Sequence, residues 1–169
     1  MPALCAFAVC LHLVNVSSAP AALVADAQRQ LVATYRAIGV DVGWSDEPGS
    51  TLLILRDDEP GGLRRPAHPL IGLAIHGAQG TPAAYVFYRR AADEADRHGV
   101  SCAAVLAATM AHEVGHLLLP SSAHALVGLM RASWDVEEFL SAARGELRFL
   151  PGEAASIRGR LGQLNPALP

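Results

Sequence analysis

One short apolar stretch of the chain contains residues that could bind and use a metal ion. The segment TMAHEVGHLLLPSSAHALVGLM, Thr109 to Met130, places three histidines and one glutamate among residues that otherwise suit a protein core. Burying ionisable groups without partners costs free energy, so each group needs a compensating interaction. A shared metal ion would provide that interaction, and the segment therefore predicts a metal site.

The spacing of the first two histidines is typical of metal ligands on a helix. His112 and His116 are four residues apart, so on a helix their side chains project from one face, about 6 Å apart along the axis. Two imidazoles at this spacing can converge on one Zn2+ ion with bonds of ~2.0–2.1 Å. Glu113 would then lie beside the ion without binding it, where it can accept a proton from a metal-bound water. We expect His112 and His116 to be ligands and Glu113 to be the catalytic base.

A catalytic zinc site needs a third protein ligand, and the next histidine is a candidate. His124 follows His116 by eight residues. The intervening residues 119–122, Leu-Pro-Ser-Ser, do not easily continue a helix, so the chain should turn there and carry His124 back toward the ion. The predicted metal set is His112, His116 and His124.

The segment as a whole resembles the metzincin class of zinc metallopeptidases. The resemblance rests on HEVGH at 112–116, on the nearby third histidine, and on the Gly-Leu-Met turn at 128–130. It implies a zincin-like catalytic domain that hydrolyses peptide bonds, with Met130 in the methionine-containing turn beneath the metal. It also implies that an antiparallel edge strand, residues 70–76, pairs with an extended peptide or protein substrate above the cleft.

The sequence departs from the metzincin pattern HExxHxxGxxH in several ways. His124 falls two residues later than the pattern requires, and Leu119 stands in the place of its glycine. No tyrosine follows the methionine turn in the position where some metzincins have a ligand. The motif covers about twenty-two residues, and the resemblance implies a divergent, minimal member.

Three alternatives stay open at the level of the sequence. In a gluzincin-type site a later helical glutamate completes the ligand set, and Glu137 or Glu138 stands at that distance from His116. Met130 could instead be an ordinary core residue, a role that methionine often has. The chain could also be a zinc-binding module with weak or no catalysis that binds a peptide or protein, although Glu113 adds nothing to metal retention.

An alternation of strands and helices must position this segment. Apolar runs and turn residues predict an α/β fold, with helices packed on a sheet and a small helical C-terminal part. The resemblance implies the α+β zincin-like kind of this fold, with a mixed, mostly parallel twisted sheet of about five strands. The predicted strands are 6–16, 40–44, 51–57, 70–77 and 83–90, the last followed by a polar connection. A first helix should begin near Ser18 as N-cap and end before Gly39, and the long active-site helix should begin at Ser101 and end before Pro120. Two shorter helical segments should follow Met130.

Length and composition favour one globular domain over residues 1–169, and the resemblance implies that this domain is catalytic. Within it, 1–118 would form the sheet and helix subdomain and 119–169 a small C-terminal subdomain. The chain is 51% hydrophobic and 17% charged, with a net charge of −3, and its tight basic pairs are only Arg64-Arg65 and Arg89-Arg90. We therefore expect no nucleic-acid partner, and a monomer is the simplest state. No apolar run is long enough to cross a bilayer.

The N-terminus and the remaining ionisable residues are less specific. The stretch up to Ala19 resembles a secretory signal, but it lacks a basic start, and we prefer a buried first strand. Three cysteines cannot form a disulfide framework, so the sequence is compatible with a secreted or a cytoplasmic location. The acidic stretch from Asp93 should be a solvated face. Surface or hydrogen-bonded roles are expected for the other histidines, His12, His68, His76 and His98.

Overall fold

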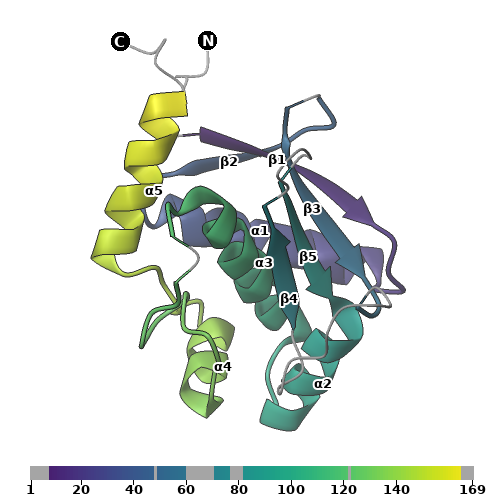
Figure 1. Ribbon diagram of the computed structural model, residues 1–169. Coiled ribbons are helices and arrows are strands. Elements are labelled where there is room, and N and C mark those ends of the chain that lie inside the picture. Colours follow the sequence, from purple (N-terminus) through teal and green to yellow (C-terminus); the bar gives the residue numbers. More distant parts are fainter. Residues whose placement is uncertain (1–7, 48, 60–70, 77–81, 122, 165–169) are drawn as a thin grey trace.

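The computed structural model describes residues 8–47, 49–59, 71–76, 82–121 and 123–164. Within these ranges the chain forms one five-stranded sheet and five helices (Figure 1). The elements are β1 Ala8–Asn15, α1 Ala21–Arg36, β2 Asp41–Trp44, β3 Thr51–Arg56, β4 Gly72–Ile75, β5 Ala83–Phe87, α2 Tyr88–His98, α3 Cys102–Leu118, α4 Val136–Ala143 and α5 Pro151–Leu164. This arrangement confirms the predicted α/β fold.

The sheet has the predicted mixed topology. Its strand order is β2-β1-β3-β5-β4, and the pairs β1–β2, β1–β3 and β3–β5 are parallel. β4 runs antiparallel to β5, with Gly72 opposite Val86 and Ile75 opposite Ala83. The expected edge strand is therefore present, although residues 70 and 77 of the predicted range lie outside the described residues.

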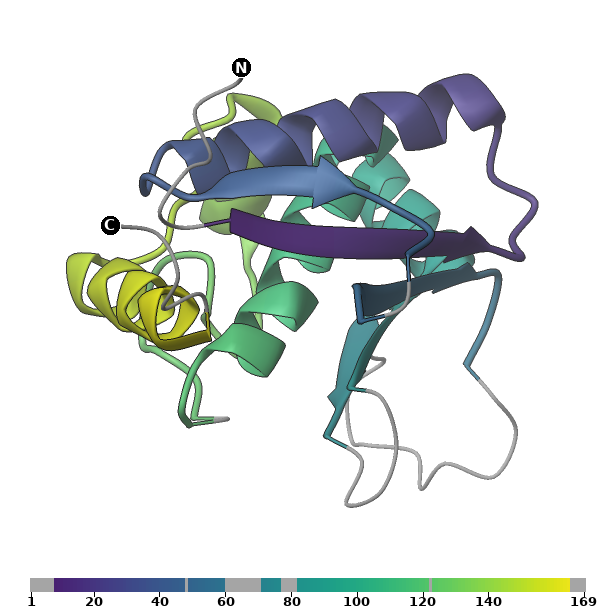
Figure 2. The ribbon, with the colours of Figure 1, turned by 90° about the horizontal axis from the view of Figure 1, so that it is seen from above.

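Helices α1 and α3 lie side by side against the sheet (Figures 1 and 2). Their buried side chains belong to one hydrophobic core that also includes residues of the sheet. Burial alternates at the start of β1, where Val9 and Leu11 are buried while Cys10 between them is exposed, whereas the inner strand β5 is buried on both faces. Tyr35 of α1 is fully buried and donates its hydroxyl proton to the backbone oxygen of Ala111 in α3 at 3.0 Å. This hydrogen bond and the surrounding core contacts fix the position of α3, the helix that was predicted to carry the metal ligands.

The start of α1 corrects one prediction. The N-cap position is Pro20, which has no capping side chain, and not Ser18. Both the backbone N–H and the hydroxyl of Ser18 donate to Oδ1 of Asp57, each at 2.8 Å. Asp57 follows β3, so this pair ties the entry of the helix to the end of a distant strand, a contact that local spacing does not reveal.

The segment after β5 corrects a second prediction. The strand ends at Phe87, and α2 begins directly at Tyr88, so residues 88–90 are helical and the supposed polar connection is a helix. Ala91 and Ala95, one turn apart, are buried, and Gly99 ends the helix with a φ of +65°. The helix was not predicted because its apolar face is narrow, consisting of these two alanines, and the rest of the segment is polar.

The second half of the chain agrees with the predictions. α3 begins after Ser101, whose side chain makes no cap hydrogen bond, and it ends before Pro120. The two C-terminal helices are present, and α4 begins with a capping box between Asp135 and Glu138. Across the described residues, no helix combines the length and apolar character needed to span a membrane. Arg64-Arg65, His68 and the first two residues of the predicted first strand lie outside the described residues.

Candidate metal centre

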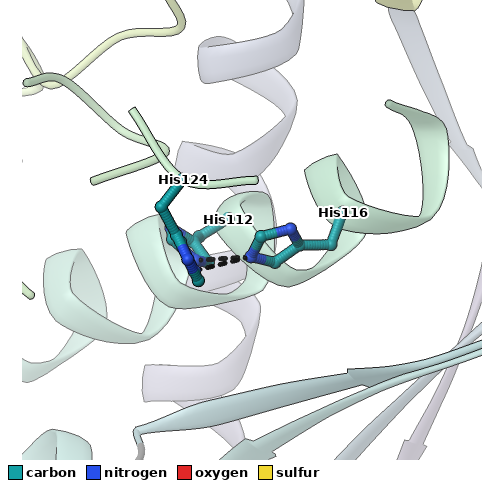
Figure 3. A group of neighbouring side chains, drawn as sticks. All are labelled: His112, His116 and His124. Carbon is teal, nitrogen blue, oxygen red and sulfur yellow. Dashed lines mark hydrogen bonds between the residues drawn. The ribbon is translucent and has the colours of Figure 1, made fainter. Parts of the chain in front are cut away.

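Three imidazoles converge on one point at the C-terminal half of α3 (Figure 3). His112 and His116 project from the helix, and His124 approaches from the loop that follows it. Nε2 of His116 lies 3.0 Å from Nε2 of His112 and 3.1 Å from Nε2 of His124. All three nitrogens lie within 4.8 Å of one another.

This geometry suits a metal ion. Three nitrogens bound tetrahedrally at ~2.0–2.1 Å are separated from each other by about 3.3 Å, close to the two observed Nε2 separations. Burial lowers the pKa of both His112 and His116 to about 4, so both rings are neutral at pH 7 and offer a lone pair. The three predicted histidines could therefore hold a metal ion together.

A backbone carbonyl fixes the tautomer of the first ligand. Nδ1 of His112 donates to the carbonyl oxygen of Leu129 at 2.7 Å, which leaves Nε2 unprotonated and directed at the shared point. Nε1 of Trp134 donates to the same oxygen at 3.3 Å, and its ring meets the ring of His112 edge-on at 5.8 Å. His116 differs, because its buried Nδ1 has no hydrogen-bond partner among the described residues.

The Gly-Leu-Met turn lies directly beneath α3. Gly128 has a φ of +82°, and Leu129 donates its N–H to the carbonyl of Arg148 at 2.9 Å. Met130 is fully buried, and a Cβ at Gly115 would lie 2.8 Å from its Sδ. The glycine between the two helical histidines thus permits close contact between α3 and Met130 of the turn.

Glu113 lies next to the imidazoles but is not one of the clustered ligands. Its side chain is buried, with 6% of its surface exposed, and burial raises the pKa of its carboxyl to about 8. A hydrogen bond from the backbone N–H of Ala74 in β4 opposes that rise. A buried acid group with a pKa near neutrality is a common feature of functional sites.

The alternative ligands do not join the cluster. Glu138 accepts hydrogen bonds from the side chain of Arg131 and, at 3.0 Å, from the backbone N–H of Asp135. Glu137 is exposed on the outer side of α4. Neither carboxylate belongs to the group of metal-binding atoms found among the described residues, which consists of the three histidines.

A cavity of about 770 Å³ opens above the histidines and Glu113. Besides these residues, β4, α2 and the segment leading into α4 contribute to its walls, among them Ala74, Glu94, His98, Trp134 and Phe139. His98 stacks on Phe139 with the ring centres 4.3 Å apart, and its Nε2 lies 3.4 Å from the carboxylate of Glu94. The volume of the cavity is large enough for part of a peptide.

Sequence reasoning missed the α2 side of the cavity. The acidic stretch that includes Glu94 was expected on a solvated face and His98 in a surface or hydrogen-bonded role, and neither was expected at the cavity that both line. The spacing of Ala91, Ala95 and the following Gly99 was the signal that could have revealed the helix. His76 also lines the cavity from the end of β4, whereas His12 pairs with Asp46 at 3.5 Å, away from it.

Comparison with protein families and with curated protein sequences gives no match. Among solved structures, a chain of the "GM1 bound form of the ECX AB5 holotoxin" aligns with 91% of this chain and 80% of its own length, at 12% sequence identity and a TM-score of 0.45. A similarity of this size carries no functional argument, so the evidence for function is the geometry of the site itself.

Proposed function

We propose that this protein is a zinc-dependent metallopeptidase. His112, His116 and His124 hold the zinc ion, and Glu113 is the general base. The observation that carries the proposal is the convergence of three Nε2 atoms beside a buried carboxyl group at the floor of a cavity.

The donor set favours zinc. Three imidazole ligands with a fourth position open to the cavity are typical of catalytic zinc sites, whereas structural sites close the fourth position with another protein ligand. When bound, zinc supplies Lewis acidity and lowers the pKa of a water toward neutrality. The hydrogen bond from His112 to the Leu129 carbonyl keeps that ring in the tautomer that can bind.

Glu113 has the position and the proton affinity that a general base needs. Its carboxyl lies beside the cavity, outside the set of clustered nitrogens. Burial raises the pKa of its carboxyl to about 8 in the metal-free protein, and the charge of a bound zinc ion would favour the ionised form, which can accept a proton. Glu113 can therefore take a proton from the attacking water and return it to the leaving amine.

The backbone of β4 supports a peptide as the substrate. Phe87 donates its N–H to the carbonyl of Ile71 at 2.8 Å, so alternate residues beginning with Ile71 bond to β5. The N–H and carbonyl of Gly72 and the carbonyl of Ala74 then point the other way, where no described strand pairs with that edge, while the Ala74 N–H meets Glu113. An extended peptide can add there as a further strand, with alternate side chains directed toward the cavity.

The proposal is tested with zinc-loaded protein and a mixed peptide library, with cleavage products identified by mass spectrometry. The wild type should cut peptides, and Glu113→Gln should keep stoichiometric zinc while its cleavage rate falls by about 100-fold or more. Cleavage that persists in Glu113→Gln would overturn the assigned base. A wild type that binds zinc and peptide but cuts nothing would favour the binding module instead.

A further inference from the structure

The side chain of Glu113 lies in direct contact with the backbone of the edge strand. A Cβ built on Gly72 would lie 2.6 Å from Cγ, 2.7 Å from Oε1 and 2.9 Å from Cδ of Glu113. Real carbon atoms do not approach this closely. The carboxyl group therefore occupies the space that any other residue at position 72 would fill.

We propose that Gly72 is a positioning residue for Glu113. This inference rests on the proposed function: the missing side chain of Gly72 lets the general base lie flat against β4, with its carboxyl turned toward the cavity. A larger residue at position 72 would push the carboxyl away while leaving the three histidines in place.

The backbone at Gly72 does not itself demand glycine. The described glycines with positive φ are at 39, 49, 99, 128 and 145, so Gly72 has a conformation open to any residue. Glycine in a strand interior weakens the strand and often marks a close approach of another group. Here that group is the Glu113 side chain, and its close approach explains why position 72 needs a glycine.

Ala74 holds the same carboxyl from a second point. Its N–H, directed away from β5, donates to Glu113, and it lies two residues along the strand from Gly72 on the same side. Gly72 supplies space and Ala74 supplies a hydrogen bond. Together they fix one orientation of a side chain that otherwise has several rotamers.

The substitution Gly72→Ala tests this inference, and Gly43→Ala in β2 is its matched control. Gly43 is also a strand glycine without positive φ, but a Cβ there would meet only Sγ of Cys10 at 3.8 Å, an ordinary contact. Glu113 can swing aside, because the crowded atoms belong to its side chain and not to backbone, so both variants should fold.

Two measurements separate a positioning role from a structural one. In Gly72→Ala, kcat for peptide cleavage should fall by about 100-fold while zinc affinity stays within about threefold, and a further Glu113→Gln change should have little additional effect. Gly43→Ala should match the wild type in both. Equal kcat in Gly72→Ala and wild type, or a full additional loss from Glu113→Gln, would overturn the inference.

The second measurement does not depend on activity, so it stands even if the wild type cleaves nothing. Hydrogen exchange at the Ala74 amide should be slow in the wild type and in Gly43→Ala, because the Glu113 carboxyl accepts its proton. It should become at least tenfold faster in Gly72→Ala and in Glu113→Ala. Unchanged protection in Gly72→Ala would mean that Glu113 keeps its place, and Gly72 would have no positioning role.

Discussion

The candidate metal centre joins two regions of different character, a buried helix and an exposed loop. His112 and His116 lie on α3, where nearly every residue is buried, and their separation follows from the helical repeat. His124 lies on the loop after α3 and is exposed. The helix thus provides a fixed pair of ligands, and the loop closes the site.

Hydrogen bonds nevertheless fix the loop that carries His124 close to α3. Ala125, next to His124, donates its N–H to the carbonyl of Met130 at 2.9 Å, and Leu129 accepts from His112. The same turn that ends the loop therefore also orients a helical ligand. The position of the third histidine therefore depends on a few loop hydrogen bonds, whereas the positions of the first two depend on the packing of the core.

Removal of a helical ligand should have the largest effect. His116→Ala should weaken zinc binding by more than the 10- to 100-fold that loss of an outer partner costs, because the fixed pair is broken. Competition with a zinc chelator measures the affinity. His12→Ala, outside the site, serves as the control and should bind zinc like the wild type; equal affinity in His116→Ala would exclude the three-histidine site.

Removal of the loop ligand should cost less. In His124→Ala a water can enter from the exposed side and replace the lost nitrogen, so we expect weaker zinc binding than in wild type but stronger than in His116→Ala. The chelator competition should rank the three proteins in that order. Unchanged affinity in His124→Ala would remove this residue from the ligand set, and Glu137→Ala and Glu138→Ala would then be measured.

Acid should destabilise the metal-free protein through the helical pair. The pKa of His112 is lowered from 6.5 to about 4 in the folded protein, so between these values the unfolded chain binds more protons and stability falls as pH falls. The loss for His112 alone is about 3 kcal/mol. Glu113 acts oppositely, since its raised pKa makes stability fall as pH rises from 4.5 to about 8.

Urea unfolding of metal-free Glu113→Gln isolates the histidine contribution, because the opposing carboxyl is gone. The free energy of unfolding should fall from pH 6.5 to 4 in this variant. His112→Ala in the same background should make the profile clearly less steep, with the remaining slope due to His116. A profile that keeps its full slope after the alanine change would show that His112 is not the group responsible.

The smallest expected effect concerns the contact between α3 and the turn. In Gly115→Ala the new methyl group would lie 2.8 Å from Sδ of Met130 and 2.9 Å from Cε1 of Phe149, which should cost about 1–3 kcal/mol of stability. Gly159→Ala on α5 is the control, because its Cβ would meet nothing within 4 Å and should stabilise that helix slightly. Thermal unfolding compares them; equal midpoints would refute tight packing of the turn.

Much of the site could be predicted because it depends on local rules. Helical spacing places His112 and His116 one turn apart on one helix with Glu113 beside His112, and Pro120 limits the length of that helix. The apolar runs likewise predicted all five strands, since each needs a buried face. The segment α2 was missed because its two buried alanines carry little hydrophobic signal among charged neighbours.

The sequence by itself determined the chemistry that is available: two imidazoles one helical turn apart, a carboxyl between them and a third imidazole after a forced bend. Only the tertiary structure decided which groups meet. It brought His124 and not Glu137 or Glu138 to the cluster, and it placed Gly72 against Glu113. The physical reason is the sequence separation over which each effect acts. Helix periodicity relates residues a few positions apart, whereas these contacts join distant segments, whose approach depends on the packing of the whole core.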